Sequence, residues 1–203
     1  WFACVILVIV IPPQTISSAL FLHFRYFDIL GIFKQLTGST LNIKGSPLPY
    51  IMLSMTGMGL KNGLYIFMIR QYFKSIPQSL EEAAYVDGAN SLGTFLRVML
   101  PQAVPILVSC FLFSFVWQWT DIFYTRLFLP TANTMYLSMR LSGLGDSLRA
   151  YLANTAGVNT PPVGRMMQII STGVLITAPP LILIYIFAQR WFIETISSTG
   201  LKD

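Results

Sequence analysis

The chain has 203 residues, of which 54% are hydrophobic and 10% are charged, and its formal net charge is +5. Soluble domains carry about 25% charged residues, so this composition predicts an integral membrane protein embedded in a lipid bilayer. Lysines and arginines are spread along the chain rather than clustered. That distribution argues against nucleic acid as a partner and favours anionic lipid.

Four apolar segments are long enough to cross a bilayer as helices, which takes about 20 residues. They cover residues 1–22, 50–73, 103–123 and 166–191. Pro12-Pro13 in the first segment and Pro179-Pro180 in the last predict kinks. Residues 24–49 are expected to form a short interfacial helix and a loop, and residues 124–165 a long polar external loop. The predicted fold class is therefore all-α, a polytopic membrane helix bundle with four spans in this chain.

The second segment contains Lys61 between Gly59 and Gly63. A lysine in the middle of a span is costly, so one interpretation is a charge that lines a translocation pathway, together with Asn62 and, from the third segment, Gln118. The alternative is that the helix is shifted or broken at the glycines, so that Lys61 reaches water or a carbonyl group. The sequence favours neither interpretation. The Gly-x-x-x-Gly spacing is only weak evidence for helix packing.

A more polar insert, residues 74–102, separates the second and third apolar segments. Ser79 and Glu82 have the spacing of a capping box, which predicts a helix start at Ser79. Gly88 is placed to end this helix in a left-handed turn. Ser91 is then expected to cap a second helix, until Pro101 interrupts it. The apolar face of this second helix is predicted to hold Leu92, Phe95, Leu96 and Met99.

The insert resembles the EAA loop of the membrane subunits of ABC importers. That pattern is Glu-Ala-Ala, three residues, Gly, nine residues, an aliphatic residue, any residue, and Leu-Pro. Here it corresponds to Glu82-Ala83-Ala84, Gly88, Val98 and Leu100-Pro101. The resemblance implies a cytoplasmic coupling loop that docks into an ATP-hydrolysing subunit. The docking residues it implies are Glu82, Ala83, Ala84, Asp87, Gly88, Leu92, Phe95, Leu100 and Pro101.

Elementary chemistry agrees with these residue types, because small alanines allow close approach and a carboxylate can bond a basic group on a partner. Without the rest of the pattern, a Ser-x-x-Glu followed by alanines is more typical of a capped surface helix. The distribution of lysine and arginine does not favour a cytoplasmic position for the loop, so that orientation depends on the resemblance.

The order of segments along the whole chain is similar to carbohydrate-uptake importers, particularly the smaller membrane subunit of maltose-type transporters. This resemblance implies a multi-pass permease in the inner membrane of a prokaryote, with six spans of which the first two are missing from this chain. It implies four kinds of partner, which are a second membrane permease subunit, two ATPase subunits, an external solute-binding protein and the bilayer. No cofactor is expected on this chain, because ATP and magnesium would bind the ATPase.

A search for catalytic or metal-binding sets gives little, since His23 stands alone and Cys4 and Cys110 lie in separate apolar runs. An enzyme is therefore not expected. The predicted function is the permease subunit of a binding-protein-dependent ABC importer for sugars or oligosaccharides. Alternatives are an importer permease for another solute, such as a glycerol phosphodiester, and, less favoured, a self-contained secondary transporter.

Overall fold

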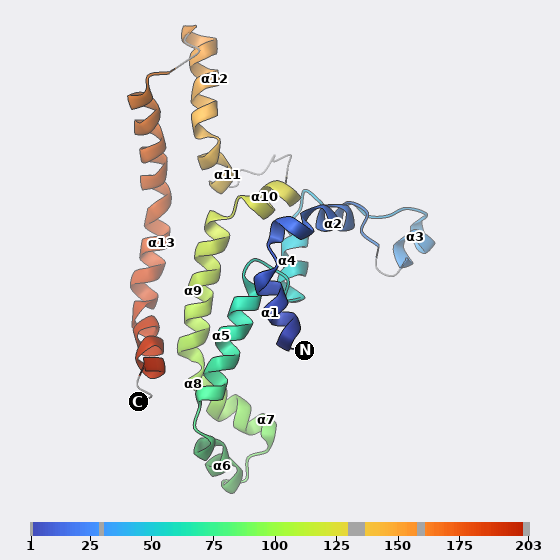
Figure 1. The fold of residues 1–203 in the computed structure, drawn as a ribbon, viewed down its shortest axis with the longest axis vertical. Helices are drawn as coiled ribbons and strands as arrows, with labels where there is room; N and C mark the ends of the chain where they lie inside the picture. Colours follow the sequence, from blue (N-terminus) through green and yellow to red (C-terminus); the bar gives the residue numbers. More distant parts are fainter. Residues whose placement is uncertain (1, 29–30, 130–136, 158–160, 201–203) are drawn as a thin grey trace. The chain divides into compact units, whose positions relative to one another are not determined.

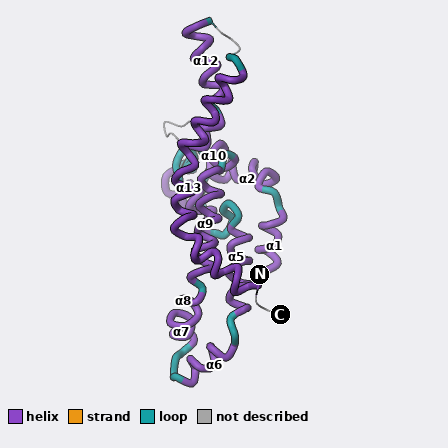
Figure 2. Tube along the Cα trace, turned by 90° about the vertical axis from the view of Figure 1, so that its left-hand side faces the viewer, coloured by secondary structure: helices purple, strands orange, loops and turns teal. Residues whose placement is uncertain are grey.

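The computed structural model describes residues 2–28, 31–129, 137–157 and 161–200. This part of the chain is helical over most of its length, and its only β-type pairing is an isolated antiparallel bridge between Phe27 and Leu41 (Figure 2). The predicted all-α class is therefore confirmed. The helices are α1 (Phe2–Val10), α2 (Pro13–Arg25), α3 (Ile32–Thr37), α4 (Leu48–Met55), α5 (Asn62–Ser75), α6 (Gln78–Val86), α7 (Ser91–Thr94), the π-helical η1 (Phe95–Met99), α8 (Leu100–Gln102), α9 (Val104–Thr120), α10 (Phe123–Phe128), α11 (Leu137–Ser142), α12 (Leu144–Ala156) and α13 (Val163–Gly200) (Figure 1).

These helices form two compact units. Unit 1 comprises Trp1–Ile11, Gly57–Val116 and Leu183–Asp203, and unit 2 comprises Pro12–Thr56 and Trp117–Ile182. The first predicted span changes unit at Pro12, where the backbone is extended (φ −63°, ψ 136°) and α1 and α2 separate. Pro13 lacks an N–H group and disfavours a helical residue before it, so the expected kink is a complete break.

The second predicted span is also two helices rather than one. Helix α4 ends at Met55, and α5 begins at Asn62 after a turn in which Gly57 (φ +78°) and Lys61 (φ +60°) are left-handed. The helix is therefore broken before Asn62, as one of the two interpretations of Lys61 expected, and the Lys61 side chain is exposed. A pathway role for Lys61 stays a prediction. Gly59 lies in this turn, so the Gly-x-x-x-Gly spacing does not form a helix face.

By length and hydropathy, one helix in the described ranges can cross a membrane by itself, over Val163–Trp191. The helical stretches Ser91–Gln102 and Val104–Thr120 meet the same test together, with a bend of 63° between them. Helix α13 continues through Pro179 and Pro180 without a break. The four predicted spans remain a prediction.

The described residues of the predicted external loop 124–165 fold mainly into α10, α11 and α12, while the external position of this segment stays a prediction. Leucines at Leu144, Leu148 and Leu152 recur at four-residue spacing, which places them on one side of α12 and gives this polar stretch an apolar helix face. Residues 130–136 and 158–160 of the same predicted loop lie outside the described residues.

Packing inside unit 1 depends on a glycine of α5. A Cβ atom added to Gly63 would lie 2.8 Å from Cγ1 of Ile9 and 3.1 Å from the carbonyl oxygen of Val5. Helix α1 can therefore approach α5 closely only because position 63 has no side chain. On the other side of α5, Tyr65 packs with Ala103, Ile106 and Cys110 in a buried cluster.

Candidate functional site

The polar insert folds as a hairpin of two helical stretches, α6 and α7–η1–α8, which we call the insert hairpin (residues 78–102). It lies at the ends of α5 and α9, between these two helices in the chain (Figures 1 and 2). Helix α6 begins at Gln78, with Pro77 in the extended conformation (φ −60°, ψ 132°) as its N-cap and no side-chain cap. The predicted capping box is therefore wrong, because Pro77 starts the helix two residues early and places Ser79 inside it.

Gly88 ends α6 as the sequence predicted. Its φ is +82°, and the N–H groups of Gly88 and Ala89 donate to the carbonyl oxygens of Tyr85 and Ala84, each at 3.0 Å. This pair of bonds is a Schellman motif, which satisfies carbonyl groups that a helix end would leave open. A left-handed residue is required at this point, and glycine adopts that conformation without steric cost.

The second stretch is capped by Asn90 rather than by the predicted Ser91. The Asn90 Oδ1 accepts a hydrogen bond from the backbone N–H of Gly93 at 2.8 Å, and Asn90 is extended (φ −81°, ψ 169°). A Cβ atom on Gly93 would lie 3.0 Å from the same Oδ1. The capping loop therefore needs a small residue at position 93 as well as an amide at position 90.

Further along, the helix widens into the π-helical η1, whose end is marked by a bond from the N–H of Leu100 to the carbonyl of Phe95. Pro101 has no N–H group with which to continue the normal i→i−4 ladder, which accounts for irregularity at this place. The predicted apolar face of this stretch is largely exposed, with Leu92 at 65% and Leu96 at 50% of full exposure. Two exposed leucines close together on one helix are typical of a surface that binds a partner.

A tyrosine that the sequence reasoning missed joins the two stretches of the hairpin. The Tyr85 hydroxyl donates to Oε1 of Glu81 at 3.2 Å and lies 3.3 Å from Oγ of Ser91. Glu81 is therefore engaged inside the hairpin. Glu82 is exposed, and within the described part of the chain no hydrogen bond or ion pair holds its carboxylate.

Between the two stretches lies a pocket of about 420 Å³, which we call the hairpin pocket. It is lined by Leu80, Ala83, Ala84, Asp87, Gly88, Ala89, Gly93, Arg97 and Val98. The structure thus brings together four of the predicted docking residues, Ala83, Ala84, Asp87 and Gly88. Ala84 is only 7% exposed, so its small size also serves the packing of the hairpin itself.

The remaining predicted docking residues lie along the second stretch. Leu92 and Phe95 are exposed, Leu100 is half-buried and Pro101 is exposed. The ring of Phe95 lies 5.9 Å from that of Phe73 at the end of α5. These positions place the predicted residues on one compact element, while the docking role of each remains a prediction.

The hairpin is attached firmly at its second end. Ala103, at the bend between α8 and α9, is fully buried in the cluster with Tyr65. One residue earlier, the carbonyl of Gln102 accepts a hydrogen bond of 2.6 Å from the Tyr72 hydroxyl. Because Tyr72 lies on α5 and Gln102 ends α8, this bond joins the second end of the hairpin to α5.

The residues predicted for a translocation pathway belong to different units. Lys61 and Asn62 are adjacent at the start of α5 in unit 1, and Gln118 is exposed near the end of α9, in unit 2. A shared pathway role for these three residues remains a prediction.

Unit 2 contains a buried polar network that the sequence reasoning also missed. Asp121, 7% exposed, accepts hydrogen bonds from the N–H of Thr125 at 3.0 Å, the N–H of Tyr124 at 3.3 Å and the hydroxyl of Tyr50 at 3.1 Å. Its backbone carbonyl accepts from Oγ of Ser138 at 2.7 Å. The carboxylate therefore ties α4, α10 and α11 together. The amides of Tyr124 and Thr125 lie in the first turn of α10, and an Asp just before a helix that accepts from such amides is a recognisable capping signal.

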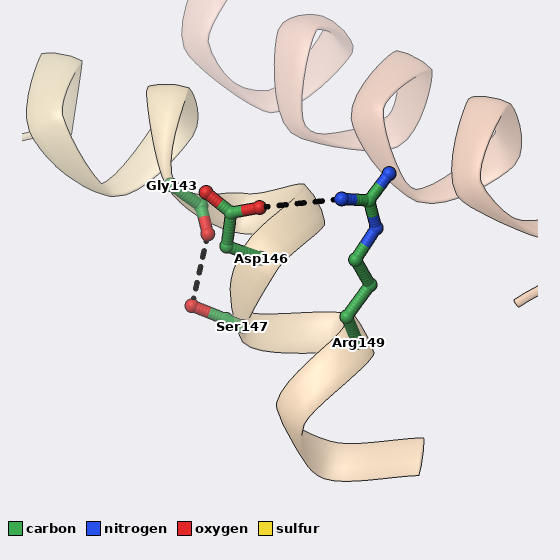
Figure 3. A network of polar contacts seen from close by, with 4 residues as sticks. All are labelled: Gly143, Asp146, Ser147 and Arg149. Carbon is green, nitrogen blue, oxygen red and sulfur yellow. Dashed lines mark hydrogen bonds and ion pairs between the residues drawn. The ribbon is translucent and has the colours of Figure 1, made fainter. Parts of the chain in front are cut away.

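The four arginines of residues 124–165 are all exposed. Arg149 Nη1 lies 3.8 Å from Oδ1 of Asp146 one turn earlier on α12, where Ser147 also donates to the carbonyl of Gly143 (Figure 3). Both charged side chains are exposed, so this ion pair contributes little to stability. Arg126 Nη2 is 3.5 Å from Oγ of Ser142, and Arg140 and Arg165 are exposed.

The described part of the chain is apolar and mainly helical, and the exposed insert hairpin lies between two apolar helices in the chain. The family described as binding-protein-dependent transport system inner membrane components matches residues 1–196, and the chain belongs to this family. It is therefore a membrane permease of the ABC transporter class, which confirms the resemblance on which the sequence interpretation depended.

Three relatives illustrate the similarity. The chain is 31% identical over 137 residues to the probable ABC transporter permease protein YurM of Bacillus subtilis, covering 68% of this chain and 41% of that protein. It is 30% identical over 139 residues to the maltose/maltodextrin transport system permease protein MalG of Salmonella typhimurium, covering 68% and 42%. It is 27% identical over 203 residues to the osmoprotective compounds uptake permease protein GgtD of Synechocystis, covering 100% and 57%. The chain thus spans about half the length of these relatives.

Proposed function

We propose that this permease couples solute import to a separate ATPase through the insert hairpin. The observation that carries the proposal is the exposed Glu82, whose carboxylate has no hydrogen bond or ion pair among the described residues, on an element that is joined to both α5 and α9. Leu92, on the second stretch of the same element, is also exposed. Closure of the ATPase pair would push the hairpin and rock the attached helices, which is alternating access by rigid-body motion.

The proposed assembly contains a second membrane permease subunit, two ATPase subunits and an external solute-binding protein, in the inner membrane of a prokaryote. The chain would cross the bilayer several times and form half of the translocation pathway. ATP and magnesium would bind the ATPase subunits, and this chain would bind no cofactor. Family membership supports this organisation.

The proposed solute is a sugar or oligosaccharide. The support is similarity to a permease named for maltose and maltodextrin transport. The similarity to a permease named for osmoprotective compounds, which extends over the whole chain, makes a small osmoprotective solute the second candidate. Uptake assays with radiolabelled maltodextrins and with small osmoprotective solutes in competition distinguish these two possibilities.

The coupling proposal is tested by charge reversal at Glu82. The full-length permease is purified from its native membrane, and the co-purifying ATPase is quantified by mass spectrometry. Glu82→Lys is expected to lower ATPase recovery by about tenfold or more, because losing one partner of an interfacial charge pair typically costs about 2 kcal/mol or more. Asp146→Lys, an equal charge reversal on an exposed site of α12, is the matched control. Full ATPase recovery with Glu82→Lys would remove Glu82 from the docking site.

A further inference from the structure

A second hollow in unit 1, of about 560 Å³, lies along α5 beside the start of α1, and we call it the α1–α5 groove. It is lined by Phe2, Ile66, Ile69, Arg70, Phe73 and Lys74. Four of the six lining side chains are apolar, and the two cations, Arg70 and Lys74, belong to the C-terminal half of α5. The volume is within the range of about 300–1,000 Å³ that is usual for ligand sites.

The two cations of the groove share one face of α5. Arg70 and Lys74 are four residues apart, a spacing that places side chains one above the other with Cβ atoms about 5–6 Å apart. Arg70 is held in place by Phe2, because its guanidinium carbon lies 3.9 Å from the centre of that ring. The Phe2 ring in turn stacks on Phe67 at 6.1 Å. Arg70 is therefore positioned toward the groove before any ligand arrives.

No carboxylate in the described ranges forms an ion pair with either cation, since the single ion pair found there joins Arg149 and Asp146. Both cations lie within the last two turns of α5, which ends at Ser75. That is also the end of the predicted span 50–73. An apolar groove that opens onto two adjacent cations is complementary to a molecule with an acyl chain and a negative head group.

We propose that the α1–α5 groove binds an anionic phospholipid of the surrounding bilayer. The phosphate lies between Arg70 and Lys74, and one acyl chain lies along Ile66, Ile69 and Phe73. Arginine suits this task because its planar group binds phosphate oxygens in pairs, while the lysine adds a mobile charge. The inference depends on membrane location and not on coupling to an ATPase.

The test measures lipid affinity of the full-length permease by native mass spectrometry in detergent. Phosphatidylglycerol and phosphatidylcholine with identical palmitoyl and oleoyl chains are titrated separately. Each cation near a membrane surface contributes about fivefold to the binding of anionic lipid, so Arg70→Gln with Lys74→Gln is expected to weaken phosphatidylglycerol binding by about 30-fold. Lys74→Gln alone changes an exposed side chain and is expected to weaken it by about fivefold without affecting folding. Phosphatidylcholine binding should change little in both variants.

Two further variants separate the groove from general surface charge. Lys34→Gln with Arg140→Gln removes two exposed cations elsewhere and should leave phosphatidylglycerol affinity unchanged. Ile66→Trp fills the apolar floor and should weaken binding of both lipids. The proposal is overturned if the control pair loses as much phosphatidylglycerol affinity as the groove pair, or if Ile66→Trp leaves the binding of both lipids unchanged. It is also overturned if the wild-type protein binds phosphatidylglycerol no more tightly than phosphatidylcholine, as expected if another protein segment fills the groove. ATPase recovery in the same preparations reports on the coupling proposal separately.

Discussion

Gly88 offers the sharpest test of how the insert hairpin works. Its φ of +82° is a conformation that costs other L-residues roughly 1–2 kcal/mol. A Cβ atom built at this position meets nothing within 4 Å. The cost of substitution therefore comes from the backbone. It acts on the Schellman turn that fixes the angle between α6 and α7.

A cost of 1–2 kcal/mol raises the population of hairpins with an open turn by roughly 5- to 30-fold. Asparagine tolerates the left-handed conformation better than alanine, and the β-branched valine tolerates it least. We therefore expect coupled transport to decrease in the order Gly88, Gly88→Asn, Gly88→Ala, Gly88→Val. The apolar helices should stay folded in all four proteins, because the turn is exposed and its loss is local.

The assay is solute uptake and solute-stimulated ATP hydrolysis by the full-length permease, reconstituted in liposomes with its co-purifying subunits. Hydrogen exchange of peptides from α6 and α7 reports the opening of the turn in the same variants. If Gly88→Asn is worse than Gly88→Ala, then side-chain bulk against a partner decides the outcome, and the backbone reasoning is wrong. Wild-type uptake by Gly88→Val would contradict the coupling role of the turn altogether.

One substitution tests the packing of unit 1, and two test the polar network of unit 2. Gly63→Ala should lower the apparent melting temperature of the solubilised protein by several degrees. The reason is that overpacking against Ile9 costs about 1–3 kcal/mol. For a chain of this size, 1 kcal/mol of stability corresponds to about 2–4 °C in melting temperature. Gly164→Ala, at an exposed helical position with open space around its Cβ, is the control and should be neutral or slightly stabilising. Asp121→Asn should lower the melting temperature more than Tyr50→Phe, because the charged acceptor serves several donors and the phenol is only one of them. An equal effect of the last two would show that the carboxylate charge is not needed.

Local signals in the sequence predicted local structure where one residue type dominates. Pro12-Pro13 predicted the break between α1 and α2, and Gly88 predicted the end of α6. Helix caps were predicted less well, because a serine is a good cap only when no stronger signal stands beside it. Pro77 preceded Ser79 and Asn90 preceded Ser91, and in each case the neighbour determined where the helix begins.

Contacts between distant residues could not be predicted in this way. The Tyr50 hydroxyl and the Asp121 carboxylate are 71 positions apart, and no local sequence pattern predicts that they form a hydrogen bond. The hairpin pocket likewise depends on the angle between α6 and α7. The contacts of the Tyr85 hydroxyl with Glu81 and Ser91 and the turn at Gly88 together hold this angle. Spacing identified the segment, whereas only the structure shows that Glu81 is engaged and Glu82 is exposed.

The attachment of the hairpin to α5 separates docking from transmission. The Tyr72 hydroxyl donates to the Gln102 carbonyl at 2.6 Å, immediately before the buried Ala103 at the bend into α9. Tyr72→Phe removes this bond, worth about 1 kcal/mol, without changing any residue of the docking surface. We expect the variant to retain the ATPase in co-purification but to move about fivefold less solute per ATP hydrolysed, since part of the displacement is lost at the base of the hairpin. Tyr151→Phe, which alters an exposed tyrosine of α12, should leave this ratio unchanged. Loss of ATPase binding by Tyr72→Phe would mean that docking and transmission cannot be separated in the hairpin. An unchanged ratio of solute moved to ATP hydrolysed would mean that the displacement reaches the membrane helices through the Ala103 bend alone.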